Sequence, residues 1–546
     1  MKKPYCSLAI GILLSLFIAA GLCAAADAPK PTGTLTVGFS TLGNEQLFVP
    51  LADQYAVMVV ENVCESLVML DKKGQVKPML ADKWEMSPDG KTYTFYLHKG
   101  VQFQGGWGEL TAEDVKYTFD RLLNEKVTPN VHAPSLRQII ASVQVVDPYK
   151  VAFNLKAPSW AFMGLINHMD PTPATTITSK KYVESVGDAK AALQPIGTGP
   201  WKLVEAQKGN QYKFEAVENH WRQTPHFKNL VFKIVPEEAT RLAMVKTGDL
   251  DITEISLGSK KEVERQGIKI RSNPGVAHVW LQLGGMIPPR YEGFDPTVPW
   301  VLNPKDAKAS ERALKVRKAM AHSIDYGQII REIYLGEALP ASVVHFNPGA
   351  TDRRWKPYAF DPKQAKKLLT EAGYPNGFDK PLEMLLISKL GSEELPTIGQ
   401  AVGMMWEKNL GLKINYVTMD TATFRGQLLA RKWKNPMFVR PGAITGSEEP
   451  VKILQVIAYK DGVTCDLFET DTTDQLMAQI LAEVDAKKRA ELNRKLGQYI
   501  YDNYLSIPIG LKNALYAVSS KVGELPMAPG RMNAAPHVFD QVTSAK

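Results

Sequence analysis

The chain has 546 residues, 45% of them hydrophobic, and 65 Lys and Arg against 57 Asp and Glu give a formal net charge of +8. This length exceeds what one hydrophobic core usually supports, so we expect more than one domain. The positive excess is mild and compatible with an anionic solute, but it argues against nucleic acid as a partner, because nucleic-acid binders gather Lys and Arg on one face.

The N-terminus reads as a secretory signal peptide at residues 1–26. Lys2 and Lys3 precede a mostly apolar run at residues 8–20, and three consecutive alanines follow it, which is the order of parts in such a signal. We predict cleavage after Ala26. The formal charge then falls from +8 to +6, because two lysines and no acidic residue are removed.

Two alternatives to a cleaved leader are weaker. An uncleaved membrane anchor would need roughly 20 apolar residues, and the run is shorter. Lipidation at Cys23 would need a small residue directly before the cysteine, and Leu22 stands there. We therefore expect a soluble protein of the periplasm. We identify no later stretch that is long and apolar enough to span a membrane.

Two cysteines, Cys64 and Cys465, remain in the mature chain. An oxidising compartment permits them to form a disulfide. The sequence does not show that their Cα atoms lie within the ~7 Å that a disulfide requires. Two free buried thiols are the equal alternative.

Strand-like runs and helical patterns alternate along the mature chain, which favours α/β lobes built on sheets. We find no repeat of fixed period and no low-complexity linker. Residues 34–39 alternate as a first strand. Residues 91–97 alternate again after the turn signal at 87–90. Thr111 can cap a helix, with Asp114 three residues on as a variant of the capping box.

Two later segments also predict helices. Residues 236–252 form a helix-like run that contains Gly248. Asp361 and Pro362 open another helix with a cap and a proline in the first turn, and Gly373 suits its left-handed end. These features describe a scaffold and are silent about function by themselves.

Five sequence blocks together resemble the family 5 solute-binding proteins of bacterial ABC importers, which bind oligopeptides, dipeptides, nickel chelates and related solutes. In order and spacing, the blocks cover nearly the whole mature chain. They lie at residues 78–115, 195–221, 236–252, 316–325 and 360–374.

The resemblance implies an α/β fold of the periplasmic-binding-protein type II class, with two lobes, a hinge and a central ligand cleft. It implies a main subdomain of lobe I from residues 27–78, 195–284 and 511–546, a small subdomain of lobe I from 79–194, and a lobe II from 285–510. Ligand contacts made by both lobes exist only when the cleft is shut, so a ligand favours the closed state.

The resemblance also implies ligand contacts in the first lobe, at the loop after the first strand, where Leu42, Gly43 and Asn44 lie. Backbone groups of this loop can bind without side-chain specificity. Trp107 and Trp160 are further candidates, because flat rings supply apolar area at a low entropy cost. Core packing is the more common position of a tryptophan.

In the second lobe, Arg431 and Arg440 stand where oligopeptide binders carry arginines that meet ligand carboxylates. A guanidinium stays charged and binds a carboxylate through two parallel hydrogen bonds. Ordinary surface or ion-paired arginines are the alternative interpretation. The remaining candidates follow Arg440 in the same loop: Gly442, Thr445, Gly446 and Ser447.

The amine contact that is usual in peptide binders is in doubt in this chain. If the step Glu449-Pro450 marks the register, the aspartate that pairs with a peptide's amino terminus is replaced by Gly446, and the tryptophan usual just before it is replaced by Ala443. Glu448 or Glu449 could substitute from a shifted loop.

No familiar enzyme motif is present in the sequence. His220 and His226 have the wrong spacing for two ligands on one helix face, and we expect both at the surface. We therefore expect a monomeric importer receptor, not an enzyme, without metal or cofactor. It would deliver a peptide or peptide-like solute, carboxylate-bearing cargo included, to the ABC permease subunits in the inner membrane.

Three alternatives to this function stay open. The same fold could bind a non-peptide solute such as a metal chelate, an opine or an oligosaccharide. It could serve a periplasmic sensor. A secreted hydrolase is the remote alternative.

Overall fold

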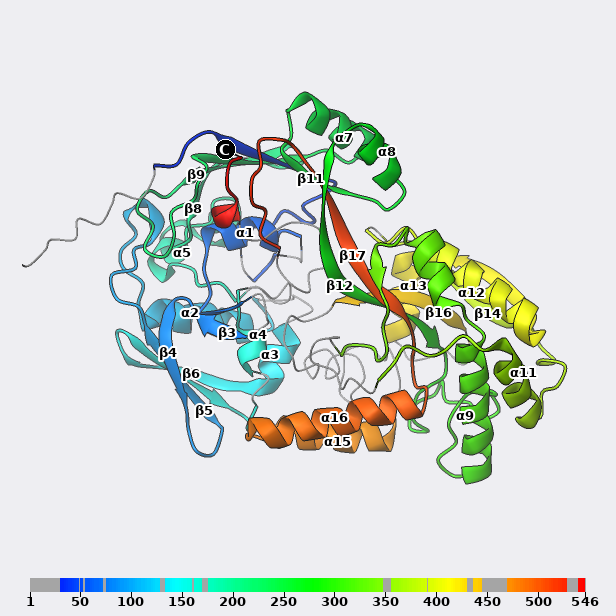
Figure 1. Ribbon diagram of the computed structural model, residues 1–546. Coiled ribbons are helices and arrows are strands. Elements are labelled where there is room, and N and C mark those ends of the chain that lie inside the picture. Colours follow the sequence, from blue (N-terminus) through cyan, green and yellow to red (C-terminus); the bar gives the residue numbers. More distant parts are fainter. Residues whose placement is uncertain are drawn as a thin grey trace, which may run out of the picture.

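The computed structural model describes residues 30–48, 50–52, 55–71, 75–127, 133–159, 162–168, 175–346, 355–389, 391–429, 436–443, 469–527 and 539–545. Two long strands, β12 (Lys269–Leu283) and β17 (Ile507–Val518), pair antiparallel and pass between the two lobes of the molecule (Figure 1).

The first lobe is built on a sheet whose central strand is the predicted first strand, β1 (Thr34–Phe39). β1 pairs parallel with two strands that come some 200 residues later, β10 and β11. The elements of this part are β8 (Trp201–Gln207), β9 (Gln211–Ala216), β10 (Asn229–Ile234), β11 (Ile252–Ile255), α1 (Val57–Val63), α7 (Glu238–Thr247), α8 (Lys260–Arg265) and η3 (Phe539–Gln541).

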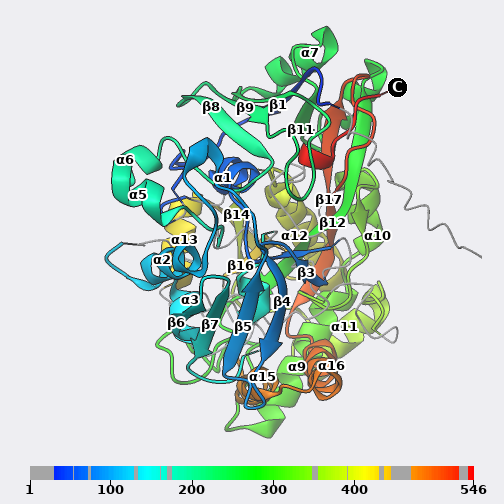
Figure 2. The ribbon, with the colours of Figure 1, turned by 90° about the vertical axis from the view of Figure 1, so that its left-hand side faces the viewer.

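An inserted segment adds a second sheet to the first lobe, of four antiparallel strands in the order β4-β5-β7-β6. It occupies the lower left of Figure 1 and faces the viewer in Figure 2. The four strands are β4 (Ala81–Met86), β5 (Thr92–Leu97), β6 (Ile140–Asp147) and β7 (Lys150–Leu155). Before them, β2 (Val68–Leu70) and β3 (Val76–Pro78) form a separate two-stranded sheet. The helices are η1 (Gln104–Gly106), α2 (Ala112–Leu123), α3 (Ala133–Ile139), α4 (Phe162–Leu165), α5 (Lys180–Val186) and α6 (Asp188–Ala191).

The helix predicted after Thr111 is α2, and the predicted cap is confirmed. Thr111 and Asp114 form a capping box that satisfies backbone N–H groups at the helix start. The apolar face of α2 then packs on the four-stranded sheet, and the ring centroids of Phe119 and Phe153 lie 4.7 Å apart.

The second lobe has a parallel core of three strands, since β14 pairs parallel with both β15 and β16. The predicted cap of α11 is confirmed, because the Asp361 side chain accepts a hydrogen bond from the Gln364 N–H. The strands are β13 (Ala338–Leu339), β14 (Leu382–Ile387), β15 (Ile414–Met419) and β16 (Met437–Ala443). The helices are α9 (Ala307–His322), α10 (Tyr326–Gln328), η2 (Ile329–Ile333), α11 (Pro362–Glu371), α12 (Leu395–Leu410), α13 (Thr421–Leu429), α15 (Asp471–Ala482) and α16 (Ala486–Asp502).

One eleven-stranded sheet runs through both lobes, in the order β15-β14-β16-β12-β17-β11-β1-β10-β9-β8, with β13 paired to β17. The hydrophobic core, in contrast, is not continuous along this sheet. On β12, Ala277 belongs to the core of the first lobe and Val279 to that of the second. On β17, Ile509 belongs to the second core and Ala514 to the first. The lobes therefore have separate cores joined by shared strands.

The α/β, two-lobed fold class expected from the sequence is confirmed by this architecture. The predicted lobe boundaries at 284/285 and 510/511 fall at the end of β12 and within β17, and the domain ranges themselves stay a prediction. Within the described ranges, no helix combines the length and the apolar run needed to cross a bilayer. The predicted signal peptide lies outside the described residues.

Candidate functional site

Strands β12 and β16 bring a basic and aromatic group of side chains onto one face of the second lobe's sheet. Trp280 lies opposite Arg440, and His278 lies opposite Gly442. Residues opposite each other on paired strands, and residues two apart on one strand, share a face. The predicted residues Arg440 and Gly442 therefore share this face with His278 and Trp280.

Gly442 is required where it stands because two rings pack against its backbone. A Cβ atom at this position would lie 2.6 Å from Cη2 of Trp280 and 3.2 Å from Cε1 of His345. The first distance is shorter than any stable contact, so a side chain would push the indole away. Because Gly442 has no side chain, the rings of Trp280 and His345 can both pack directly against the β16 backbone.

His345 comes from the loop between β13 and α11 and covers this face. Its ring centroid lies 5.1 Å from that of Trp280, at an interplanar angle of 73°, and 5.9 Å from that of His278. Its φ is 67°, in the left-handed region, which is uncommon for residues other than glycine although His adopts it more often than most. Its side chain is buried, and neither ring nitrogen has a hydrogen-bond partner among the described residues.

Electrostatics keep the imidazoles neutral on this face. Burial lowers the pKa of His345 well below its usual value, and the nearby His278 and Arg440 lower it further. Burial likewise lowers the pKa of His278 to about 3, and the nearby Phe346 backbone opposes this shift. Arg440 is half-buried, and its Cζ atom lies 5.2 Å from the centroid of the Trp280 ring. A cation held over an indole in this way is stabilised by the ring.

A cavity of about 680 Å³ lies between the lobes, beside β17. Most of its charges are acidic and come from both lobes. The Glu394 carboxylate pairs with Lys512 of β17 at 3.0 Å. Burial raises the pKa of Glu254, at the end of β11, to about 7, although Arg241 opposes the shift. The charged lining residues are Glu237, Glu238, Arg241, Glu254, Glu332, Glu393, Glu394 and Lys512.

A salt bridge between the lobes lies near this cavity. Glu337, just before β13, pairs with Lys260 of α8 at 3.0 Å. Its carboxylate also accepts hydrogen bonds from Ser272 and from the Asn513 amide. These partners hold the pKa of Glu337 below its ordinary value, against the effect of burial.

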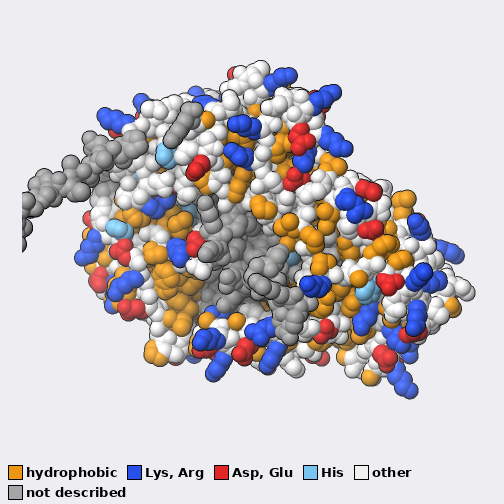
Figure 3. Space-filling view, in the orientation of Figure 1, with side chains coloured by type: hydrophobic (Ala, Val, Ile, Leu, Met, Phe, Trp, Pro, Cys, Tyr) orange, Lys and Arg blue, Asp and Glu red, His pale blue; other side chains and the backbone are white. Residues whose placement is uncertain are grey.

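Surface charge is mixed on the face of the molecule that Figure 3 shows. Lys and Arg side chains are interspersed with Asp and Glu over the described part of this face.

The loop after β1 forms hydrogen bonds within itself. Leu42 is buried, with 1% of its surface exposed, and the Gly43 N–H donates to the Thr41 hydroxyl. The Asn44 amide donates to the Leu51 carbonyl, and its oxygen accepts from the Gln46 N–H. Ligand contact by Leu42, Gly43 and Asn44 stays a prediction.

Trp107 is half-buried and lies edge-on to Tyr182, with ring centroids 5.0 Å apart. Its place in the cleft stays a prediction. Five other predicted site residues lie outside the described residues: Trp160, Arg431, Thr445, Gly446 and Ser447.

Whether Cys64 and Cys465 form a disulfide or remain two free thiols is not tested. Cys64 is a buried thiol whose Sγ lies 3.9 Å from the Ile196 carbonyl oxygen, and burial raises its pKa to about 12. Cys465, its predicted partner, lies outside the described part of the chain.

The glycines at 197 and 199 in the second sequence block have a structural role. A Cβ atom at Gly197 would lie 2.6 Å from the Cα of Cys64, and one at Gly199 would lie 2.6 Å from the Asn62 carbonyl oxygen. Both glycines therefore permit the chain to pass directly against the end of α1.

His220 is buried, so the prediction that it lies at the surface was wrong. Its Nε2 atom lies 2.7 Å from the Thr198 carbonyl oxygen and 3.9 Å from the Glu65 carboxylate. Residues distant in sequence, Thr198 and Glu65 among them, contact the imidazole and bury it. The spacing of histidines along the chain gives no information about such contacts. His226 is exposed, as predicted.

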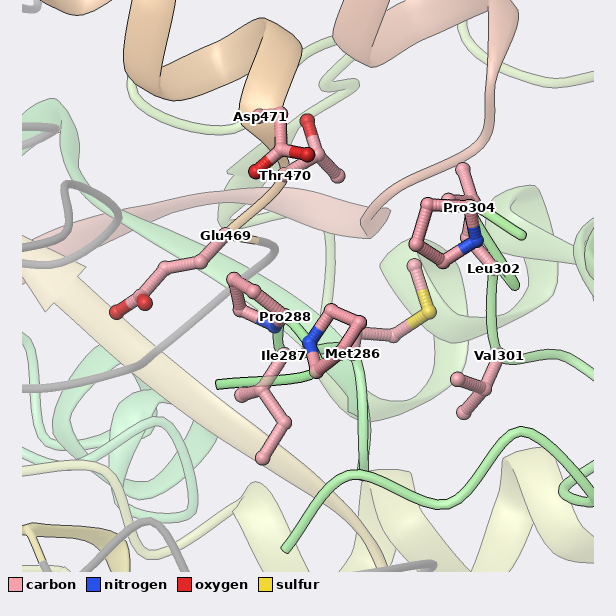
Figure 4. Close-up of a pocket in the computed structure, with 10 residues that line it drawn as sticks. Met286, Ile287, Pro288, Val301, Leu302, Pro304, Glu469, Thr470 and Asp471 are labelled. Atoms are coloured by element: carbon pink, nitrogen blue, oxygen red, sulfur yellow. The ribbon is translucent and has the colours of Figure 1, made fainter. Parts of the chain in front are cut away.

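A small pocket in the second lobe is lined on one side by Val301, Leu302 and Pro304 and on the other by Glu469, Thr470 and Asp471 (Figure 4). Its volume of about 30 Å³ has room for water but not for a peptide. The Glu469 carboxylate pairs instead with Arg290 at 3.1 Å.

Sequence reasoning missed three residues of the β12–β16 face: His278, Trp280 and His345. The two on β12 could have been found from their spacing of two residues on a strand. Nothing in the sequence links His345 to Arg440, because the contact depends on how a loop folds over the sheet.

Comparison with known proteins gives a consistent result. The model of the family described as "Bacterial extracellular solute-binding proteins, family 5 Middle" matches residues 75–464. The glutathione-binding protein GsiB of Salmonella paratyphi A is 30% identical over 489 residues, which cover 86% of this chain and 87% of that protein. Heme-binding protein A of Haemophilus influenzae is 26% identical over 487 residues, which cover 84% and 82%.

Solved structures share the fold. HbpA2 from Haemophilus parasuis superposes with a TM-score of 0.77 at 22% identity, covering 94% of this chain and 100% of that one. The periplasmic binding protein DppA from Helicobacter pylori, in complex with the peptide STSA, superposes with a TM-score of 0.71 at 22% identity, covering 94% and 98%.

Proposed function

This chain belongs to the family 5 bacterial extracellular solute-binding proteins, and from this premise we propose that it captures a peptide or peptide-like, carboxylate-bearing solute between its lobes and delivers it to an ABC permease. Members of this family are the ligand-binding components of such importers. The observation that carries the proposal is the pair of lobes with separate cores, joined by β12 and β17.

Two rigid bodies on shared strands can act as a receptor without chemistry. A solute that contacts both lobes is bound fully only in the closed state, so it shifts the population toward closure by its difference in affinity for the two states. A micromolar dissociation constant corresponds to about 8 kcal/mol, which is ample to hold a nearly balanced hinge shut. The permease would then recognise the closed form.

Two observations favour peptide-like cargo. The Salmonella relative of 30% identity is named for glutathione, a tripeptide with free carboxylates. Arg440, on the β12–β16 face, supplies a permanent positive charge. We also propose that the protein acts as a monomer in the periplasm after its leader is cleaved, and that cargo leaves it unchanged.

Small-angle scattering combined with native mass spectrometry tests this function. The protein, stripped of cargo, is mixed with glutathione or with a pool of di- to pentapeptides. We expect the radius of gyration to fall, a mass increment equal to one intact ligand, and a rise in melting temperature. Addition of the loaded receptor to its permease in proteoliposomes should stimulate ATP hydrolysis.

Three results would contradict the proposal. Unchanged dimensions and mass with every peptide would exclude peptide cargo. A ligand recovered in cleaved form would indicate an enzyme. A loaded receptor that closes but never stimulates the permease would favour a sensor.

A further inference from the structure

The two lobes touch at a second place, away from the strands that join them. Figure 1 and Figure 2 both show the turn between β4 and β5 of the first lobe beside the loop between α15 and α16 of the second. This contact lies at the lower end of the molecule, whereas β12 and β17 enter the first lobe near the top. The lobes are therefore also joined at the end opposite the shared strands.

Gly90 and Val484 form the centre of this contact. A Cβ atom on Gly90 would lie 2.8 Å from Cγ1 of Val484 and 3.1 Å from Cβ of Pro158. Gly90 is buried, although the tip of a turn between two strands is normally exposed to water. Val484 keeps 40% of its surface exposed, so more than half of this side chain is covered. The contact thus buries apolar groups from both lobes.

Hydrogen bonds hold the first-lobe side of the contact in place. The Gly90 N–H donates to the Ser87 carbonyl at 2.8 Å and closes the turn. The Tyr93 hydroxyl of β5 donates to the Ser159 carbonyl at 3.3 Å, so the segment around Pro158 is tied to the same sheet. These bonds fix the surface that the second lobe meets.

The second-lobe side is fixed as well. The Arg489 guanidinium of α16 donates to the carbonyl oxygens of Glu483 and Val484 at 3.1 and 3.2 Å. The Asp485 side chain caps α16 and accepts a hydrogen bond from the Lys488 N–H at 2.9 Å. Because the loop between α15 and α16 is already ordered, Val484 meets the first lobe at a small cost in conformational entropy.

We propose that Val484, Gly90 and Pro158 form a clasp that holds the lobes closed, and that opening of this clasp limits the release of cargo. The inference rests on the proposed function, because it concerns how long the closed receptor keeps its cargo. Apolar groups that meet only in the closed state favour that state by the free energy of their burial. The clasp joins protein to protein, so its contribution is the same for every cargo that the lobes enclose.

This equal contribution separates a clasp from a residue that binds cargo. Loss of a cargo contact weakens some ligands more than others. Loss of the clasp lowers the population of the closed state and raises the dissociation rate of every ligand by one common factor. Association begins from the open state, so its rate should stay nearly unchanged.

Stopped-flow kinetics of Val484→Ser, with glutathione and tetra-alanine as probes, tests this common factor. Serine replaces two methyl groups of the contact by one hydroxyl. We expect both probes to dissociate about 3- to 10-fold faster and to associate within about twofold of the wild-type rate. Val146→Ser on β6 is the matched control, because Val146 is 54% exposed in the first lobe, and it should match the wild type.

A pair of cysteines tests the contact without cargo. Gly90→Cys combined with Val484→Cys places two Cβ atoms within reach of a disulfide, given the 2.8 Å between the Gly90 Cβ position and Cγ1 of Val484. Mild oxidation captures even a rarely populated closed state, so we expect the bond in the cargo-free protein, identified by peptide mass mapping. In the loaded protein, the bond should retain tetra-alanine until a reductant is added. The single-cysteine variants are the controls.

Three outcomes overturn the clasp. The first is a wild-type dissociation rate in Val484→Ser, and the second is a pair of factors that differ between the two probes by more than about threefold. The third is absence of the disulfide in a double-cysteine variant whose calorimetric transitions show that it is folded. Failure of the proposed function gives a different pattern, because the disulfide then forms although neither probe binds, and the clasp stands while peptide cargo is rejected.

Discussion

Glu65 offers a sharp test of how the second sequence block stabilises the first lobe. Its carboxylate is 0% exposed. It accepts hydrogen bonds from the Thr198 hydroxyl at 2.9 Å, the Trp221 indole N–H at 2.9 Å and the Arg222 guanidinium at 3.0 Å. Arg222 also pairs with Asp540 from the C-terminal segment at 3.2 Å. One buried carboxylate thus joins three stretches of chain, those around residues 65, 198 and 221. Arg222 extends the network to the C-terminal segment.

Replacing Glu65 by Gln keeps the shape and removes the charge. Breaking a buried ion pair from one side costs about 3–5 kcal/mol. We expect the lower end, about 3 kcal/mol, because Arg222 keeps Asp540 as a partner. For a lobe of this size, that loss lowers the melting temperature by about 5 °C.

Differential scanning calorimetry of the cargo-free protein measures this change. The transition of the first lobe should shift and that of the second lobe should stay, since the two cores are separate. Glu85→Gln is the matched control, because the Glu85 side chain is 61% exposed, and it should change stability by less than about 0.5 kcal/mol.

A double-mutant cycle with Arg222→Met completes the test. Direct partners should show a coupling of about 1–3 kcal/mol. A shift in melting temperature below about 2 °C for Glu65→Gln, or additive effects in the cycle, would refute the assignment of Glu65 as the centre of this network.

Gly442→Ala should destabilise the second lobe by about 1–3 kcal/mol, because the added methyl overlaps a packed indole; an unchanged calorimetric transition would contradict this. Burial raises the pKa of Glu254 to about 7, so its contribution to stability is full below its unfolded pKa of about 4.3 and is lost as the pH rises through about 7. Glu254→Gln should remove that slope from melting temperature plotted against pH, and an identical slope would count against it. Lys260→Met should remove the salt bridge to Glu337 at a cost of up to about 1 kcal/mol and broaden the distribution of lobe separations measured by scattering; an unaltered distribution would show that the bridge does not restrain the hinge. Burial raises the pKa of Cys64 to about 12, so iodoacetamide should label it only after unfolding, as peptide mass mapping can check, and rapid labelling of the folded protein would be the opposite result.

Local elements could be predicted because their causes are local. Thr111 and Asp114 lie three residues apart and satisfy the same helix end, so the capping box can be identified from four residues. The start of α11 at Asp361 follows the same rule. The alternation of β1 reflects its two faces. None of these features depends on a distant part of the chain.

The candidate site could be predicted only where resemblance pointed to it. Arg440 and Gly442 were expected from their place in the second lobe, and they do share one face of the sheet. Their partner His345 could not be found, since it reaches them from a loop almost 100 residues earlier. The surface position predicted for His220 was wrong for the same reason, because Thr198 and Glu65 bury it.

The sequence by itself determined the family, the α/β class and the helix and strand starts, because these depend on residue order, periodicity and capping over short spans. Only the tertiary structure decided that Gly197 and Gly199 are places of close packing, that one carboxylate links three stretches of chain, and that a neutral imidazole faces an arginine. Those properties arise from burial and from distances between residues far apart in sequence. They cannot be predicted from the order and spacing of residues along the chain.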